Sequence, residues 1–334
     1  MKALLLDFPA PVREAPLHLA EIPPPAPLAD QVVVKVSACA LGHADLQTVE
    51  GELPLERLPI IPGHQVVGRV VETGPQTSRF QEGQRVGLGR LFHACGACPF
   101  CQSDREHLCR QAEFTGLHRD GGLAEYLVAF QDFLVPLPED FTDETAAPLL
   151  SLGLLAFRSL RLAGLAPGGR LGLFGFGASP QLALQIARLW NCQVFVFSRV
   201  LGQQALAREM GASWTGYLDD PPPALLDGAV IFSPGGSQAA DALTALNRGG
   251  TLVLAGLHLG ALHGLAYERH LSDEKSVRSV TGGSRRDLEE FLEWAARHRL
   301  QPRVQAFALE EANRVLQQLK AGQLDGAGNP VLRL

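Results

Sequence analysis

The sequence predicts an α/β protein in which a β-rich domain precedes a doubly wound parallel sheet. Short β segments between turns fill the first part of the chain, and strands alternate with helices from Pro148 onward. The length of 334 residues allows two domains of roughly 100–200 residues each. We place the first domain at 1–147, the second at 148–285 and a C-terminal segment at 286–334.

The first domain is expected to be mostly β because its short apolar runs are separated by proline and glycine, and helical periodicity is scarce. The expected strands are 32–36, 65–74, 85–89 and 124–129.

The second domain opens with a helix-like apolar run at 148–159, after which strands and helices alternate. This alternation predicts right-handed βαβ units and a parallel, doubly wound sheet. The expected strands are 170–174, 193–198, 228–236 and 251–257, and the expected helices are 181–190, 203–212 and 238–250. The C-terminal part adds two amphipathic helices, at 285–299 and 310–320.

Composition argues against several classes of partner. The net charge is −6, and the basic residues are scattered, which argues against nucleic acid. No apolar run approaches the roughly 20 residues of a membrane span, and the N-terminus lacks the features of a signal peptide. Six cysteines in so long a chain do not suggest a secreted disulfide scaffold. We therefore expect a cytoplasmic protein that acts on a small-molecule substrate.

Four of the six cysteines follow the spacing C-x-x-C-x-x-C-x7-C at Cys95, Cys98, Cys101 and Cys109. Four thiolates on a small loop can close a tetrahedron around Zn²⁺ and leave no position for water or substrate. The pattern therefore predicts a structural zinc site in a lobe at about 93–110. Unligated core cysteines and an iron–sulfur cluster are the alternatives, although the spacing fits neither common ferredoxin pattern.

A glycine loop joins the expected strand 170–174 to the following helix. Two glycines allow a sharp turn and a close approach of a pyrophosphate, which can accept from amides at the helix N-terminus. The third glycine of the dinucleotide pattern is absent, and Pro180 takes its place. We expect a dinucleotide site rather than an ordinary βα turn. Its candidate residues are Gly175, Phe176, Gly177, Ala178 and Ser179.

The next strand ends at Ser198 and Arg199, where an acidic residue would bind the ribose of NAD. A hydroxyl followed by a guanidinium is better suited to a 2′-phosphate. We therefore predict NADP(H) as the cofactor. The alternative is that Arg199 is a solvated surface residue.

Over essentially its full length the chain resembles the zinc-type alcohol dehydrogenases of the medium-chain dehydrogenase/reductase superfamily. The resemblance implies a GroES-like β domain that carries the substrate site, a Rossmann domain and C-terminal helices that return to the first domain. It also implies a homodimer or homotetramer with its active site in the interdomain cleft. The matching segments are 43–54, 61–74, the cysteine lobe, 114–129, the glycine loop and 309–322.

The chain departs from this family at the catalytic zinc. Members hold that zinc with a Cys in a C-x-x-D context, a His in a GHE context and a second Cys just before the Rossmann domain. The corresponding residues here are Gly42, His64 and Ser151, and His64 is followed by Gln65 rather than Glu. A catalytic zinc needs about three ligands of N, S or carboxylate type, so these residues argue against one. Cys39 matches a non-ligand cysteine, and we expect it to be a buried apolar residue.

Asp45 is expected to orient the imidazole of His64 and to leave its other ring nitrogen free for the substrate. His64 is therefore our first candidate for a proton donor. Ala44 replaces the hydroxyl residue that starts the proton relay of the family. The resemblance places His43 near the cofactor pyrophosphate, with proton transfer as a second role.

Ser151 and Gln65 complete the polar groups expected at this catalytic site. Together these features predict an NADPH-dependent reductase that lacks a catalytic zinc and reduces an activated C=C, C=N or C=O bond. Two alternatives remain open: a zinc-dependent alcohol or aldehyde dehydrogenase with a rebuilt metal site, and a catalytically inactive NADPH-binding protein.

Overall fold

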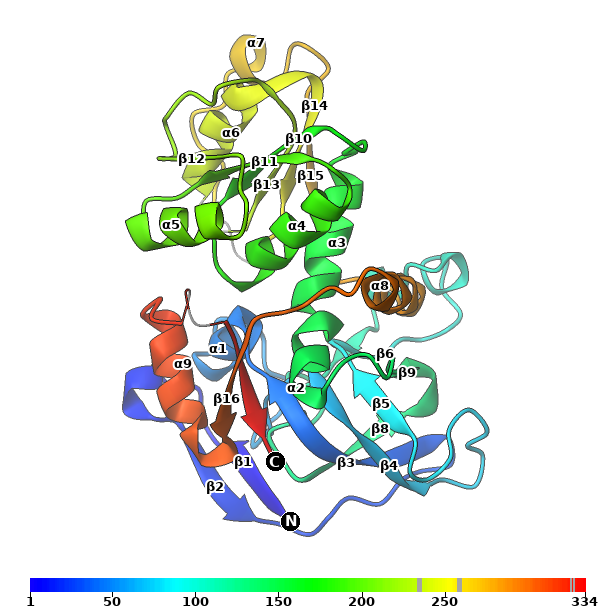
Figure 1. Cartoon of the computed structure of the whole chain (residues 1–334). Helices are drawn as coiled ribbons and strands as arrows, with labels where there is room; N and C mark the ends of the chain where they lie inside the picture. Colours follow the sequence, from blue (N-terminus) through cyan, green and yellow to red (C-terminus); the bar gives the residue numbers. More distant parts are fainter. Residues whose placement is uncertain (233–235, 257–259, 325, 327) are drawn as a thin grey trace. The chain divides into compact units, whose positions relative to one another are not determined.

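The computed structural model describes residues 1–232, 236–256, 260–324, 326 and 328–334. The chain divides into two compact units, which are described separately (Figure 1). The first unit contains Met1–Ser151 and Gly282–Leu334, and the second contains Leu152–Thr281. The divisions fall after Ser151 and Thr281, whereas the sequence analysis placed them after 147 and 285. Among the described residues, no helix has both the length and the apolar character needed to cross a bilayer.

The first unit is built on a seven-stranded sheet with the order β16-β17-β3-β4-β5-β9, in which β8 also pairs with β3. All four strands that the sequence analysis expected in this region are present, as β3, β4, β5 and β8. The C-terminal strand β17 pairs antiparallel with β3, so the end of the chain belongs to this unit. The strand bounds are β3 Gln31–Ala40, β4 Val66–Thr73, β5 Arg85–Leu88, β8 Tyr126–Phe130, β9 Leu134–Pro136, β16 Val304–Ala308 and β17 Asn329–Arg333.

Close packing between β3 and β4 depends on Gly68. A Cβ at this position would lie 2.2 Å from the backbone oxygen of Lys35. A side chain there would therefore force the two strands apart, which explains a glycine inside a strand.

Smaller elements surround this sheet, and the sequence analysis expected only α8 and α9 among them. The bounds are β1 Lys2–Leu6, β2 Leu17–Glu21, β6 Leu91–His93, β7 Glu113–Phe114, α1 His43–Val49, α2 Asp143–Ala146, α8 Arg285–Arg297 and α9 Ala312–Lys320. Ser284 caps α8, since its Oγ accepts from the amide of Asp287 at 3.0 Å, while its own amide donates to the Asp287 carboxylate.

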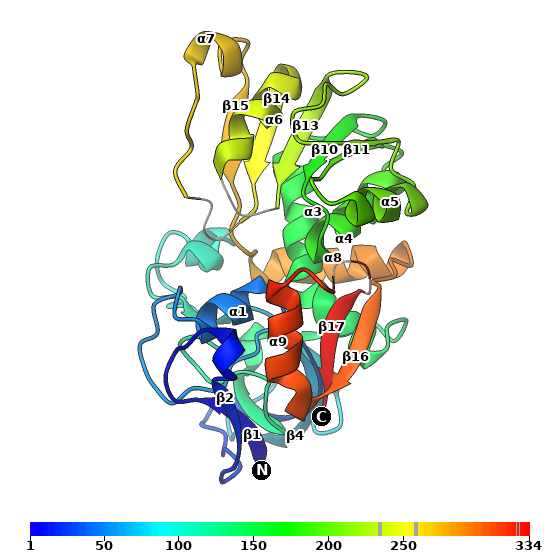
Figure 2. The same cartoon turned by 90° about the vertical axis from the view of Figure 1, so that its left-hand side faces the viewer.

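The second unit contains a six-stranded parallel sheet with the order β12-β11-β10-β13-β14-β15. This order is the Rossmann order 3-2-1-4-5-6. Figure 2 shows β15, β14, β13, β10 and β11 side by side in this succession. The predicted α/β class, with a parallel doubly wound sheet, is therefore confirmed. The strands are β10 Arg170–Phe174, β11 Gln193–Phe197, β12 Trp214–Gly216, β13 Leu226–Ile231, β14 Leu246–Leu254 and β15 Ser276–Ser279.

The helices of this unit are α3 Leu152–Leu162, α4 Ala178–Leu189, α5 Leu201–Glu209, α6 Ala239–Ala245 and α7 Tyr267–His270. The expectation of a helix through 250 is wrong, because α6 ends at Ala245 and β14 begins at Leu246. Gly249 has a φ of +71°, and two consecutive glycines are poor helix formers. The expected ends of the strands at 228–236 and 251–257 include residues 233–235 and 257, which lie outside the described residues.

Candidate catalytic and cofactor sites

The carboxylate of Asp45 is held at both of its oxygen atoms. Asp45 is the third residue of α1, and its Oδ2 accepts from the amide of Gly42 at 2.8 Å, so it satisfies a donor at the start of the helix. Its Oδ1 accepts from Nδ1 of His64, also at 2.8 Å. Only 3% of Asp45 is exposed, so these two contacts fix a buried negative charge.

His64 is the central residue of a three-residue chain that links Asp45 to Ser151. The proton on Nδ1 is directed to Asp45, which leaves Nε2 as the ring nitrogen that can interact with other groups. This Nε2 lies 3.2 Å from Ser151 Oγ. The expected second ring nitrogen therefore faces the hydroxyl of Ser151, and its role toward a substrate stays a prediction. His64 is 4% exposed and Ser151 is partly exposed, so the hydroxyl is the outer group of the Asp45–His64–Ser151 chain.

Gln65 does not offer its side chain to a ligand, contrary to the sequence-based expectation. It is completely buried, and its Nε2 donates to the backbone oxygen of Ala40 at 3.2 Å. The amide of Ala40 in turn donates to the backbone oxygen of Gln65. Gln65 therefore joins β3 to the start of β4.

Cys39 is also completely buried. Burial raises the pKa of its thiol, and the negative charge of Asp45 raises it further. The side chain is thus a neutral thiol inside the core, as expected for a small apolar residue.

His43 is exposed at the first position of α1. Its contact with a cofactor phosphate and its part in proton transfer both stay predictions.

Arg90, which the sequence analysis did not single out, lies near the Asp45–His64–Ser151 chain. It stands between β5 and β6, and its charge interacts with that of Asp45. The sequence contains a feature that could have identified Arg90, because it is a single charged residue between the apolar runs 86–88 and 91–92.

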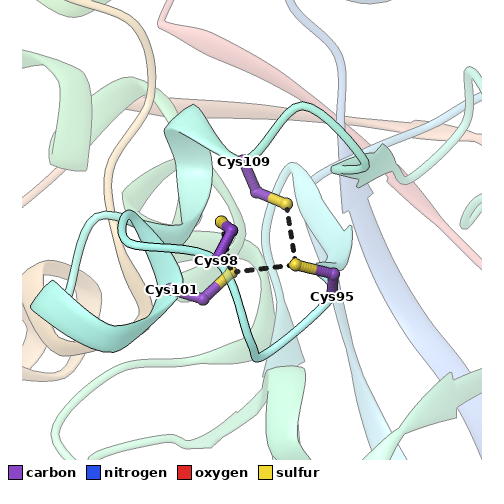
Figure 3. A group of neighbouring side chains, drawn as sticks. All are labelled: Cys95, Cys98, Cys101 and Cys109. Carbon is purple, nitrogen blue, oxygen red and sulfur yellow. Dashed lines mark hydrogen bonds between the residues drawn. The ribbon is translucent and has the colours of Figure 1, made fainter.

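The four clustered cysteines are arranged as one ligand set. Their sulfur atoms all lie within 4.8 Å of one another, and Figure 3 shows the four side chains gathered within one lobe. The Sγ–Sγ distances are 3.9 Å for Cys95–Cys101, 3.6 Å for Cys98–Cys101 and 3.5 Å for Cys109–Cys95. A zinc–sulfur bond of about 2.3 Å in a tetrahedron places sulfur atoms about 3.8 Å apart, so the geometry fits the metal.

The loop strongly favours the thiolate form of one of these cysteines, Cys95. Backbone amides of Ala97 and Cys98 lower the pKa of Cys95 to about 6, whereas burial raises the pKa of Cys101 to about 12. Amides directed at a sulfur favour the thiolate, which is the form that binds a metal.

The cysteine lobe is also fastened to α8. Glu106, only 3% exposed, accepts from both the amide and Nε of Arg285, at 2.8 and 3.0 Å. Arg286 forms a second, exposed ion pair with Asp104 at 3.1 Å. The first turn of α8 is therefore held by residues that lie between the third and fourth cysteines.

The glycine loop of the second unit begins directly at the end of β10. Gly175 has a φ of +88°, and its amide donates to the backbone oxygen of Phe197 at 2.8 Å. Phe176 is buried, and Gly177 occupies the N-cap of α4 without a side-chain cap. The amides of Ala178 and Ser179 stand at the first positions of the helix, where a phosphate can accept them.

Ser198 and Arg199 differ sharply in their surroundings. Ser198 is buried, its hydroxyl donates to Gln203 Oε1 at 2.6 Å, and it accepts from the amide of Val200. In this structure the proton of this hydroxyl holds the start of α5, and a contact of Ser198 with a phosphate stays a prediction. Arg199 is exposed. It remains the candidate for the phosphate.

Comparison with known proteins matches both units. Residues 28–139 match the family described as alcohol dehydrogenase GroES-like domain, and residues 180–297 match the zinc-binding dehydrogenase family. The chain is 39% identical over 332 residues to a probable alcohol dehydrogenase of Mycobacterium tuberculosis, covering 98% of this chain and 96% of that protein. It is 32% identical to an alcohol dehydrogenase of Geobacillus stearothermophilus, covering 93% and 94%.

The fold is likewise similar to that of a solved cinnamyl alcohol dehydrogenase from Sorghum bicolor. The TM-score is 0.89 at 26% identity, and the match covers 99% of this chain and 97% of that one. The chain therefore belongs to the zinc-type alcohol dehydrogenase family of the medium-chain dehydrogenase/reductase superfamily, and it is an alcohol dehydrogenase-like oxidoreductase.

Proposed function

We propose that this protein is an NADPH-dependent reductase that acts without a catalytic zinc. Its substrate is a small molecule with an activated C=C, C=N or C=O bond. The observation that carries the proposal is the Asp45–His64–Ser151 chain, in which both nitrogens of the histidine are engaged by protein groups.

The donor set around His64 does not fit a catalytic zinc. Such a site needs about three nitrogen, sulfur or carboxylate ligands and one open position. Gly42 has no side chain, Ser151 offers a neutral hydroxyl, and the amide of Gln65 is committed to Ala40. Among the described residues, only the four cysteines of the lobe bring three or more His, Cys, Asp or Glu ligands close enough to share an ion.

In the proposed reaction, NADPH held at the glycine loop and Arg199 would supply the hydride for a substrate that is already electrophilic. Ser151 donates a hydrogen bond to the substrate atom that becomes negative, and His64 Nε2 replaces the proton that the hydroxyl gives up. The carboxylate of Asp45 stabilises the imidazolium before this transfer and keeps the remaining proton on Nδ1 afterwards. The hydride and the proton together complete the reduction.

Arg199 supports the choice of NADPH. It is an exposed guanidinium two residues after the end of β11, in a position where an NAD-binding enzyme has an acidic residue. The uncapped N-terminus of α4 supports a pyrophosphate in the same unit.

The cysteine lobe is proposed to bind a structural zinc. Four sulfur ligands complete the tetrahedron, so no position is left for a substrate. Zinc would then stabilise the lobe and, through Glu106 and Arg285, the start of α8.

Elemental analysis of protein never exposed to added metal is expected to find one zinc per chain. Changing Cys109→Ser should remove it, because three thiolates bind zinc less tightly than four. The variant His64→Ala should retain one zinc. Two zinc ions per chain, with one lost in His64→Ala, would instead establish a zinc-dependent dehydrogenase with a rebuilt site.

Removal of zinc with a chelator is expected to speed hydrogen exchange in residues 93–110 and in the first turn of α8. The reason is that Glu106, which holds Arg285, lies between two zinc ligands. Exchange in β10 of the second unit serves as the control and should not change. Unaltered exchange at 285–288 in the metal-free protein would contradict this coupling.

NADPH is expected to bind at least about tenfold more tightly than NADH in a fluorescence titration, since a charge-assisted hydrogen bond contributes roughly 1.5–3 kcal/mol. Arg199→Gln should remove most of this preference by weakening NADPH alone. Arg248→Gln, which changes an 85% exposed arginine of the same unit, is the matched control. Tighter binding of NADH to the unchanged protein would reject the assignment.

Ser151→Ala and His64→Ala are each expected to lower turnover with an enal or quinone by about 100-fold or more, because proton donation is lost. The Kd for NADPH should stay the same. Ser78→Ala, which removes an exposed hydroxyl, is the control. If unchanged protein binds NADPH but reduces no enal, quinone, imine or ketone, it is an inactive cofactor-binding protein.

A further inference from the structure

Arg90 begins next to the segment that carries Ser151. A Cβ on Gly89 would lie only 2.8 Å from the backbone oxygen of Leu150, so these two backbones are in close contact. Leu150 directly precedes Ser151, and Arg90 directly follows Gly89. The backbone of Arg90 therefore lies close to that of Ser151, the outer residue of the Asp45–His64–Ser151 chain.

The loop that holds Arg90 is firmly fixed. Thr115, 3% exposed, donates from its amide to Arg90 O and from its hydroxyl to Gly89 O, both at 2.9 Å. The guanidinium carbon lies 5.1 Å from the ring centroid of Phe114. One face of the guanidinium is thus covered by an aromatic ring, and the N–H groups at its edge are left for a planar partner.

A second arginine in the same unit shows what a satisfied guanidinium looks like. Arg85 donates to Asp143, to Pro138 O and to Phe141 O, at 2.7, 3.0 and 2.8 Å. Arg90 has no equivalent set: within the described ranges, no carboxylate forms an ion pair with it and no acceptor takes its N–H groups. The guanidinium of Arg85 thus has protein acceptors for its N–H groups, whereas among the described residues that of Arg90 has none.

Arg90 therefore carries a charge that is partly removed from water and not paired. Burial lowers the pKa of its guanidinium, and the charge of Asp45 opposes this effect. Arginine stays protonated under such conditions. Both oxygens of Asp45 are already used by Gly42 and His64, so Asp45 attracts Arg90 without forming a hydrogen-bonded pair. A partly buried charge without a hydrogen-bonded partner is destabilising unless a bound ligand of opposite charge pairs with it.

We propose that Arg90 binds a carboxylate of the substrate, so that the substrates are small aldehydes, enones or imines that carry a carboxylate close to the reacting bond. This inference rests on the proposed reductase function. The planar guanidinium would hold the carboxylate by two parallel hydrogen bonds and thereby orient the reacting bond toward Ser151.

Binding is tested with butyrate and butyramide, which have the same shape, differ in charge and contain no bond that the enzyme can reduce. Calorimetric titration of the NADPH-loaded protein is expected to show that butyrate binds more tightly. Arg90→Gln should weaken butyrate by about 10- to 100-fold and leave butyramide and NADPH unchanged. Arg90→Lys should weaken butyrate less, because it keeps the charge without the planar fork.

Arg314→Gln is the matched control, because Arg314 also lies over an aromatic ring, that of Phe307 at 5.4 Å, but is exposed and paired with Glu311. It should bind butyrate as the unchanged protein does. Equal affinity of the unchanged protein for butyrate and butyramide, or equal butyrate affinity with and without Arg90, would overturn the proposal. A loss of NADPH affinity in Arg90→Gln, with no selective loss of butyrate, would assign Arg90 to the cofactor instead.

Turnover separates this inference from the reductase function. The acid 4-oxobut-2-enoate should have a KM at least about tenfold lower than that of its methyl ester, and Arg90→Gln should raise the KM of the acid alone. Selective butyrate binding without reduction of either compound would retain the role of Arg90 and reject the reductase. Equal reduction of acid and ester, unaffected by Arg90→Gln, would retain the reductase and reject the role of Arg90.

Discussion

The carboxylate of Asp45 is the constraint on which the rest of the first site depends. One oxygen satisfies the amide at the start of α1, and the other fixes both the tautomer and the orientation of His64. This second contact directs Nε2 toward Ser151, so the residue that caps α1 also orients the imidazole of the proposed proton donor. The same buried charge raises the pKa of the Cys39 thiol and attracts the Arg90 guanidinium. Asp45 thus contacts the Gly42 amide and the His64 imidazole, and its charge acts on the Cys39 thiol and the Arg90 guanidinium.

The sequence predicted best those features that depend on local spacing. The repeat of Cys95, Cys98, Cys101 and Cys109 required only a tight loop, and the alternation of strands and helices determined the parallel sheet. The roles of Gln65 and Ser198 could not be predicted, because the acceptors of their protons, Ala40 O and Gln203 Oε1, are identified only by the folded structure. The contact of His64 with Ser151 joins residues 87 positions apart and was missed for the same reason.

The proposed absence of a catalytic zinc agrees with the balance of charge around His64. Two thiolate ligands would offset the two positive charges of a catalytic zinc. Removing only the metal would leave two partly buried thiolates near Asp45, and removing only the thiolates would leave the ion uncompensated. Gly42 and Ser151 together avoid both conditions, because neither side chain carries a charge.

Cys39 shows that this environment does disfavour a thiolate. Its pKa is raised first by burial and then by Asp45, whose amide partner is Gly42 itself. A cysteine at position 42 without a metal would lie close to the same carboxylate and would be driven to its neutral form in the same way. Such a neutral thiol would be a weaker hydrogen-bond donor than a hydroxyl. Ser151 instead supplies an oxygen within hydrogen-bond distance of His64, which is the hydroxyl that the proposed zinc-free mechanism requires.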